Sequence, residues 1–247
     1  MNVVITEKEY EINYYEIDYK KRALITTIIN YLGDVSTKQS ELRGVGIDYM
    51  KENRIAWVLY KWHINVSKYP MYGDKITVRT IPVSFKKFYA YRRFEVINSL
   101  GEKIMEASSV WLLIDIDKRK PKRITEDMVI AYGITEDNKE GLQTPKLSNF
   151  ENVDIEKNFN VRYEDIDTNG HVNNAKYVSW ILEAVPLDIV TNNTLRSITI
   201  TYKKETGYGH CIKSCSQIIN DGNEIICNHK IINEEGKEIT LAKTIWS

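Results

Sequence analysis

Along the first half of the chain, the spacing of hydrophobic and polar residues switches from a strand-like pattern to a helical one and back. It predicts a strand over residues 10–19 and then a helical segment over residues 23–51 with a break near Gly33. Runs rich in β-branched and aromatic residues follow, and turn residues such as Gly73 and Gly101 separate them. The predicted strands cover residues 55–66, 75–84, 88–97 and 103–116. The order in this half is therefore strand, helix and four further strands.

The second half predicts the same order of elements in a shorter form. A short strand over residues 158–163 precedes a helix over residues 174–185, and Pro186 ends this helix because proline cannot continue it. Four strands follow, over residues 195–202, 211–219, 224–232 and 238–246. Two halves with one order of elements indicate an internal repeat.

Residue identities support the repeat. Four residues late in the first half match four at the end of the chain at one constant offset of 135 positions: Gly101, Ile104, Ala107 and Trp111 against Gly236, Ile239, Ala242 and Trp246. A weaker match lies near the start of each half, where Ile17-Asp18 resembles Ile166-Asp167 at an offset of 149. The second copy is therefore shorter inside than the first.

The helix predicted over residues 174–185 is hydrophobic on much of its surface. Two neighbouring stripes at helical spacing are formed by Ala175, Val178, Leu182 and Val185, and by Tyr177, Ile181 and Ala184. Such a helix must be largely buried, and an antiparallel sheet that curls around it would bury it. The order of elements, met twice, predicts an α+β fold of two tandem hotdog domains, each a curled antiparallel sheet around a central helix. We expect an N-terminal domain over residues 1–132, a linker over residues 133–150 and a C-terminal domain over residues 151–247.

Composition and charge are those of an ordinary globular protein. Hydrophobic residues make up 43% and charged residues 28%, which argues against extensive disorder. The 34 basic and 34 acidic side chains cancel, so no overall positive field attracts nucleic acid. The N-terminal residues lack an apolar signal segment, residues 110–114 are too short to span a membrane, and three cysteines do not make a secreted disulfide framework. We expect a soluble, cytoplasmic protein with reduced thiols.

Residues 165–174 carry a dense group of polar side chains directly before the buried helix. They read DIDTNGHVNN, so carboxylate, amide and imidazole groups stand together. Gly170 permits an unusual backbone angle, and an asparagine near the cap position leaves backbone N–H groups of the helix pointing outward. With the positive end of the helix dipole, such donors suit the stabilisation of an oxyanion. Acid and amide groups before a helix usually cap it, so the pattern alone leaves a structural role open.

The stretch from Asp167 to Glu183, DTNGHVNNAKYVSWILE, closely resembles the signature of the acyl-acyl carrier protein thioesterases of plants and bacteria. Residues 200–207, ITYKKETG, are similar to that family's strand with a tyrosine, two basic residues and Glu-Cys-Gly. By this resemblance, the family's catalytic residues fall on Asp167, Asn169, His171 and Glu205. The resemblance implies hydrolysis of fatty acyl thioesters carried on the phosphopantetheine of acyl carrier protein, with no cofactor and no metal.

The same resemblance bears on the nucleophile. Thr206 stands where plant relatives often have a cysteine that was once proposed to attack the thioester. A mechanism with a cysteine nucleophile is therefore not expected for this chain.

The four residues suit the chemistry of a thioester. A thiol leaving group with a pKa near about 8.5 departs with little protonation, so the demanding tasks are to activate water and to hold the oxyanion. We expect Glu205 to accept the proton of water, His171 and Asn169 to orient water or carbonyl, and Asp167 to fix those two side chains. Strand alternation places Glu205 on the face opposite Tyr202, so it reaches the site only if a bulge or the strand end intervenes.

The first half lacks this constellation. With the halves aligned on Asp18, Lys20 and Arg22 stand where the second half has Asn169 and His171. We therefore expect catalysis in the C-terminal domain alone and an N-terminal domain that shapes the acyl-chain site. Its aromatic residues either line an acyl tunnel or pack in the core; they include Trp57, Tyr60 and Trp62.

Other signals are weaker. Histidines and cysteines between residues 210 and 229 lie along predicted strands without paired Cys-x-x-Cys motifs, so a metal is not expected. Basic clusters could dock an acidic carrier protein, although a solvated surface is their usual role; they lie at residues 20–22, 86–87, 92–93, 119–120 and 203–204. Two alternatives stay open, a hotdog hydrolase of acyl-coenzyme A and a non-catalytic acyl-binding hotdog protein. Oligomeric state, including a homodimer, also stays open.

Overall fold

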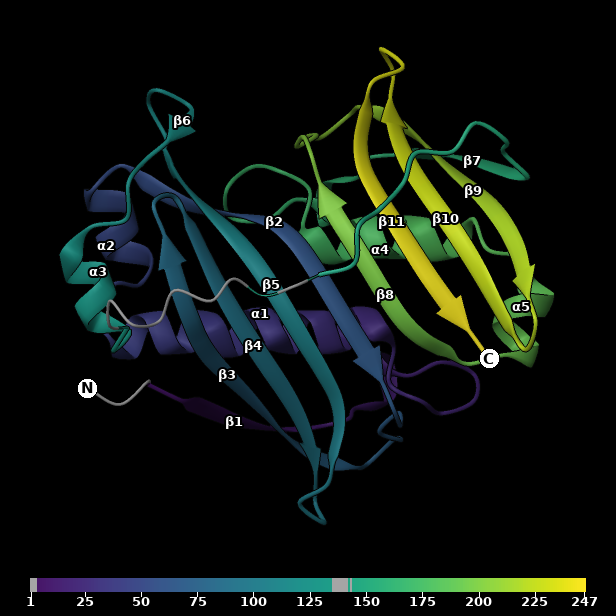
Figure 1. Ribbon diagram of the computed structural model, residues 1–247, viewed down its shortest axis with the longest axis horizontal. Helices are drawn as coiled ribbons and strands as arrows, with labels where there is room; N and C mark the ends of the chain where they lie inside the picture. The colour runs from purple at the N-terminus through teal and green to yellow at the C-terminus, as the bar shows by residue number, and fades with distance from the viewer. Residues whose placement is uncertain (1–3, 135–141, 143) are drawn as a thin grey trace. The chain divides into compact units, whose positions relative to one another are not determined.

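The computed structural model of the protein describes residues 4–134, 142 and 144–247. The chain forms two compact units, one from Met1–Tyr60 and Ser67–Thr144, the other from Lys61–Val66 and Pro145–Ser247. Each unit has an antiparallel sheet and one main helix (Figure 1). The predicted linker over residues 133–150 includes residues 135–141 and 143, which lie outside the described residues.

The first unit contains one long helix, shorter helices and a sheet. Its elements are β1 (Thr6–Glu11), η1 (Tyr14–Glu16), α1 (Ile25–Leu42), α2 (Ile47–Glu52), β2 (Ile55–Val66), β3 (Lys75–Lys86), β4 (Tyr89–Asn98), β5 (Lys103–Asp115), β6 (Lys120–Pro121) and α3 (Glu126–Ala131). The strand order is β1-β3-β4-β5-β2, and β1, β3, β4 and β5 pair antiparallel in that order. The last residues of β2 belong to the second unit, where they pair with β8 (Leu195–Tyr202).

Helix α1 packs against β1 and β3 through one hydrophobic face. Ile28, Leu32 and Val35 recur at helical spacing on that face and are almost completely buried. The helix ends where Gly44 takes a positive φ of 70°, and the N–H groups of Gly44 and Val45 donate to carbonyls of the last turn. Glycine favours this left-handed conformation, so the sequence around Gly44 ends the helix.

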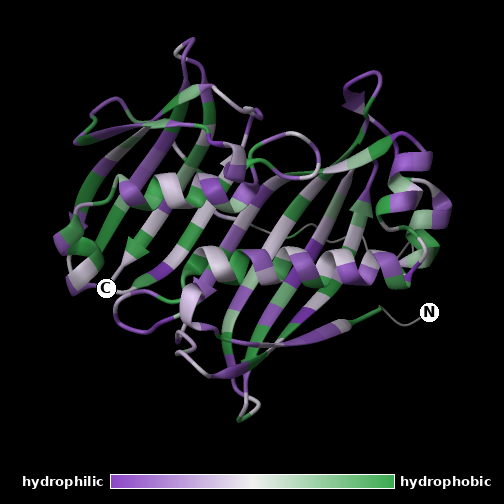
Figure 2. Cartoon of the chain, turned by 180° about the vertical axis from the view of Figure 1, so that it is seen from behind, coloured by the Kyte–Doolittle hydropathy of each residue, from purple (hydrophilic) through white to green (hydrophobic). Residues whose placement is uncertain are grey.

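The second unit repeats the arrangement in fewer residues. Its elements are β7 (Ile155–Asn160), η2 (Tyr163–Asp165), α4 (Asn174–Glu183), α5 (Leu187–Asn192), β8, β9 (Cys211–Asp221), β10 (Glu224–Asn233) and β11 (Glu238–Trp246). The strand order is β8-β11-β10-β9-β7, with every neighbouring pair antiparallel. Hydrophobic residues recur along the strands with polar residues between them (Figure 2). Helix α4 packs on β9 and β10.

Three local predictions are wrong in their bounds. The strand predicted over residues 10–19 ends at Glu11, and a 3₁₀ turn follows it. The helix does not break near Gly33, because one glycine in a helix costs only about 1 kcal/mol and the buried face continues through it. The strand predicted over residues 158–163 runs from Ile155 to Asn160 instead.

Hydrogen bonds confirm the repeat found at an offset of 135. In the β4–β5 turn, Asn98 Oδ1 accepts from the N–H of Glu102 at 2.9 Å. In the β10–β11 turn, Asn233 Oδ1 accepts from the N–H of Lys237, also at 2.9 Å. The indole N–H groups of Trp111 and Trp246 each donate to the hydroxyl two residues earlier, at 2.7 and 2.9 Å. The two copies therefore share turn geometry as well as residue identity.

Among the described residues, no helix is both long and apolar enough to cross a membrane. The three cysteines are free thiols, with Cys211 exposed and the other two buried.

Candidate active site

The polar loop before α4 is a tight turn held by Asp167. The Asp167 N–H donates to the carbonyl of His171 at 2.8 Å, and the Asp167 carbonyl accepts from the Gly170 N–H at 3.0 Å. The Asp167 Oδ1 atom accepts from the Asn169 N–H at 2.8 Å. Gly170 has a φ of 79°, a conformation that side chains other than glycine rarely adopt. The Asp167 carboxylate therefore fixes the backbone that carries Asn169 and His171.

His171 and Glu205 come together in this structure. His171 Nε2 lies 3.2 Å from Glu205 Oε1, and the two side chains are 38% and 37% exposed. Strand β8 ends at Tyr202, so Glu205 lies in the loop after the strand and strand alternation does not restrict it. The strand end thus removes the difficulty that sequence alternation raised. The pair is accessible to a substrate and has the geometry of a base and its hydrogen-bond partner.

Backbone amides at the start of α4 are largely occupied. Asn173 is the N-cap, and its Oδ1 atom accepts from the Ala175 N–H at 2.9 Å. The Val172 N–H donates to the carbonyl of Thr206, and the Asn173 N–H donates to the carbonyl of Asp165. The expectation of outward-pointing free N–H groups in the helix is therefore wrong for Ala175, and the N–H groups of the two residues before the helix are bonded as well. The side-chain amide of Asn169 is exposed and could donate to an oxyanion.

The polar segment also contains a buried carboxylate, Asp165. The side chain of Asp165 is 0% exposed and pairs with Arg162 at 3.1 Å and with Lys176 at 3.3 Å. Burial alone would raise the pKa of Asp165, but the hydrogen bonds from Arg162 and Lys176 hold it below its usual value. Sequence reasoning placed Asp165 in the polar segment without a role. Basic residues three positions before it and eleven after it were the available signal.

The first unit has the same loop with different side chains. The Asp18 N–H donates to the carbonyl of Arg22 at 2.8 Å, and Asp18 Oδ1 accepts from the Lys20 N–H at 2.8 Å, as in the second copy. Arg22, at the place of His171, forms an ion pair with Asp18 at 2.8 Å and lies over the ring of Tyr69. A guanidinium has only N–H donors, so Arg22 cannot accept a hydrogen bond as the ring nitrogen of a neutral histidine can.

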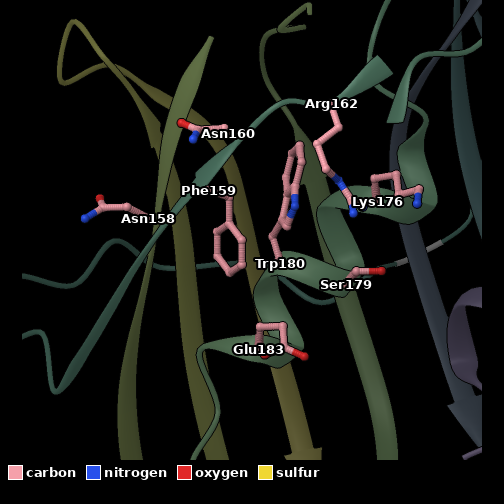
Figure 3. Close-up of a pocket in the computed structure, with 8 residues that line it drawn as sticks. All are labelled: Asn158, Phe159, Asn160, Arg162, Lys176, Ser179, Trp180 and Glu183. Carbon is pink, nitrogen blue, oxygen red and sulfur yellow. The ribbon is translucent and has the colours of Figure 1, made fainter. Parts of the chain in front are cut away.

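A groove of about 540 Å³ lies between β7 and α4 in the second unit. Figure 3 shows the residues that line it, which are Asn158, Phe159, Asn160, Arg162, Lys176, Ser179, Trp180 and Glu183. The rings of Phe159 and Trp180 stack with centroids 6.1 Å apart, and the two cations are those that pair with Asp165. None of the four predicted catalytic residues lines this groove.

Within the described part of the chain, no cluster of three metal-binding side chains occurs. The imidazole of His229 is buried between the hydroxyls of Ser216 at 2.7 Å and Thr244 at 2.8 Å. Burial lowers the pKa of His229 to about 3, so the ring is neutral and its contacts are those of a core residue.

The aromatic residues of the first half differ in burial. Trp62 is 1% exposed, Tyr60 is 42% exposed, and Trp57 packs against the hydrophobic cluster that contains Leu113 and Met128. Trp62 is therefore a core residue, and Trp57 is partly buried against the core. The lining of an acyl tunnel stays a prediction.

Two family models match the chain. The acyl-ACP thioesterase N-terminal domain matches residues 4–132, and the acyl-ACP thioesterase C-terminal domain matches residues 148–247. Among curated relatives, the chloroplastic palmitoyl-acyl carrier protein thioesterase of Arabidopsis thaliana is 28% identical over 99% of this chain and 64% of its own length. The chain thus spans slightly less than two thirds of that relative.

Solved structures share the fold. A protein from Lactobacillus plantarum, provisionally named an oleoyl thioesterase, has a TM-score of 0.93 and 24% identity, covering 99% of this chain and 96% of its own. The 12:0-ACP thioesterase from Umbellularia californica has a TM-score of 0.84 and 24% identity, with coverages of 98% and 94%. These likenesses confirm the predicted fold class, two tandem hotdog domains.

Proposed function

Because the chain belongs to the acyl-ACP thioesterase family, we propose that it hydrolyses fatty acyl thioesters of acyl carrier protein to free fatty acid and holo-carrier protein. The observation that carries this proposal is the His171–Glu205 pair, accessible to solvent and next to a loop that Asp167 shapes. Both residues stand at positions where the family's motifs have catalytic groups. The substrate is therefore the acyl chain on the phosphopantetheine arm of the carrier protein.

The mechanism assigns one task to each side chain. Glu205 accepts a proton from water as the water attacks the thioester carbonyl, and His171 holds the carboxylate and the water in line. Asn169 donates its side-chain amide to the oxyanion, while Asp167 keeps the loop in shape. Collapse of the tetrahedral intermediate expels the phosphopantetheine thiolate, which is a good leaving group because thiols ionise near pH 8.5.

The two domains divide this work. Catalysis belongs to the C-terminal domain over residues 151–247, and the N-terminal domain over residues 1–132 shapes the acyl-chain site. This division rests on the Arg22–Asp18 ion pair, which puts a guanidinium, a group with hydrogen-bond donors only, where the second copy has the imidazole of His171. A cytoplasmic location is supported by the three free thiols, because reducing compartments keep cysteines unpaired.

The test compares two carriers for the same acyl groups. Purified protein is incubated with acyl-carrier protein thioesters of several chain lengths and with the matching acyl-coenzyme A thioesters, and thiol release is followed for each. We expect a higher kcat/KM for the carrier-protein thioesters. A marked preference for coenzyme A thioesters would assign the chain to the acyl-coenzyme A hydrolases, and no thiol release from either set would indicate acyl binding without catalysis.

A further inference from the structure

Thr206, the residue after Glu205, has both of its backbone polar groups in hydrogen bonds. The carbonyl of Thr206 accepts from the N–H of Val172, which lies in the catalytic loop, at 3.1 Å. The N–H of Thr206 donates to the hydroxyl of Tyr177 at 3.2 Å. Thr206 is 9% exposed, so this N–H has little access to water. Loss of its partner would therefore cost more free energy than the loss of a hydrogen-bond partner at the surface.

Tyr177 is itself rigidly placed. It is 2% exposed on α4, and its ring packs edge-to-face on Trp180 and on Tyr202, with centroids 5.5 Å apart in both pairs. Burial raises the pKa of Tyr177 to about 12, and the negative charge of Asp167 acts in the same direction. The phenol therefore stays protonated at neutral pH and keeps one oxygen lone pair for the Thr206 N–H. From its place in the hydrophobic stripe of the helix, the sequence predicted that Tyr177 is buried but did not predict this hydrogen bond.

The first copy of the fold lacks both partners of this bond. The Ala23 N–H donates to the carbonyl of Pro70 at 2.9 Å, as the Val172 N–H does to Thr206, so Pro70 is the counterpart of Thr206. Proline has no N–H to donate. The residue at the place of Tyr177, counted from the start of each helix, is Ile28, which is fully buried and has no hydroxyl.

The bond is therefore absent where the catalytic side chains are absent. Packing alone does not require a tyrosine here, because Ile28 fills the equivalent place in the first copy. Tyr69, which directly precedes Pro70, stands at the place of Glu205 and contacts Arg22 rather than a histidine. The Tyr177 hydroxyl and the Thr206 N–H are therefore found in the copy that also has the Glu205 carboxylate, and not in the other copy.

We propose that Tyr177 is a positioning residue: through the backbone N–H of Thr206 it holds the Glu205 carboxylate against His171. This inference rests on the proposed function, because it concerns the same reaction. Loss of the hydroxyl leaves Val172 as the contact on the other side of Thr206 and lets the Glu205 segment move relative to the loop. A displacement of about 1 Å in a reacting group can cost on the order of 100-fold in rate.

The first experiment removes only the hydroxyl. Tyr177→Phe keeps the ring and its aromatic contacts, and we expect kcat on acyl-carrier protein to fall roughly 10- to 100-fold with KM changed by about twofold or less. The matched control is Tyr202→Phe, because Tyr202 is buried beside Tyr177 and its hydroxyl donates to the carbonyl of Asn174 at 3.0 Å rather than bonding to Thr206. We expect its kcat to stay within about threefold of the wild type. Equal losses in the two variants would overturn the proposal.

A double-mutant cycle separates positioning from general damage. In a Glu205→Gln background the base is already gone, so adding Tyr177→Phe should change kcat by about twofold or less. Thr206→Pro removes the same bond from the donor side, and Pro70 occupies the equivalent place in the first copy. In that background too, Tyr177→Phe should add no further loss. Full additivity in both backgrounds would refute the positioning role. A wild-type protein without thioesterase activity would instead refute the proposed function.

Discussion

Glu205 and Thr206 are adjacent in the chain, yet they should respond to substitution in opposite ways. Glu205→Gln keeps the shape of the side chain and an oxygen near His171 Nε2, now 3.2 Å from the carboxylate. An amide cannot accept a proton from water, so general-base catalysis is lost. Removal of a general base typically costs about 100- to 10,000-fold in rate, which corresponds to about 3 to 5 kcal/mol of transition-state stabilisation.

Thr206 contributes to the site through its backbone. Its N–H donates to Tyr177, its carbonyl accepts from Val172, and alanine retains both groups. Thr206→Ala should therefore change kcat by about threefold or less, with a small loss of packing as the main cost. Thr206→Cys should be similarly mild, because a thiol there keeps the same backbone contacts.

Steady-state kinetics of the purified variants on acyl-carrier protein measure both effects, and circular dichroism checks that each variant is folded. Mass spectrometry of the wild-type protein, quenched during turnover, tests for an acyl-enzyme. An acylated Thr206, or a Thr206→Ala variant as inactive as Glu205→Gln, would show covalent catalysis and contradict direct attack by water.

Three further predictions concern the loop and the core. His171→Ala should lower kcat at least about 100-fold, whereas Arg22→Ala in the first copy should leave it within about threefold; comparable losses in folded variants would show that the site lies elsewhere. Asp167→Asn keeps the acceptor for the Asn169 N–H and should retain far more activity than Asp167→Ala in the same thiol-release assay; equal losses would show that the site needs the charge of Asp167. Because His229 is neutral when folded and its pKa rises on unfolding, its contribution to the free energy of unfolding should fall by about 1.4 kcal/mol per pH unit as the pH drops from about 6.5 towards 4. Urea titrations of His229→Gln should lack this part of the slope.

Much of the fold was predictable from sequence because its strands are bounded by strong turn signals. The strands at residues 195–202 and 238–246 have the predicted ends, and the repeat at an offset of 135 reflects two turns with the same hydrogen bonds. The helix break was misplaced because a glycine's effect depends on its φ. Gly44 has a positive φ and ends α1, whereas Gly33 lies inside it.

The site was less predictable because its contacts join segments distant in sequence. The motifs identified His171 and Glu205, but only the end of β8 at Tyr202 explains how the carboxylate reaches the imidazole. The hydrophobic periodicity predicted that Tyr177 is buried, and its ring is buried. The periodicity did not predict the hydrogen bond that its hydroxyl accepts. A hydrogen bond to a backbone N–H leaves no pattern in the sequence, since every residue except proline offers that donor.

The two copies of the loop separate what the fold needs from what the chemistry needs. Asp18 and Asp167 make the same backbone contacts, at the same 2.8 Å to the N–H two residues on, although only the second copy has His171 beside it. An aspartate retained where the imidazole is absent is there to shape the turn. The residues that differ, His171 and its partner Glu205, are those that we propose to act in the reaction, and the turn forms equally well with Arg22 in place of the histidine. The duplication therefore supplies an internal control that a single-domain protein would lack.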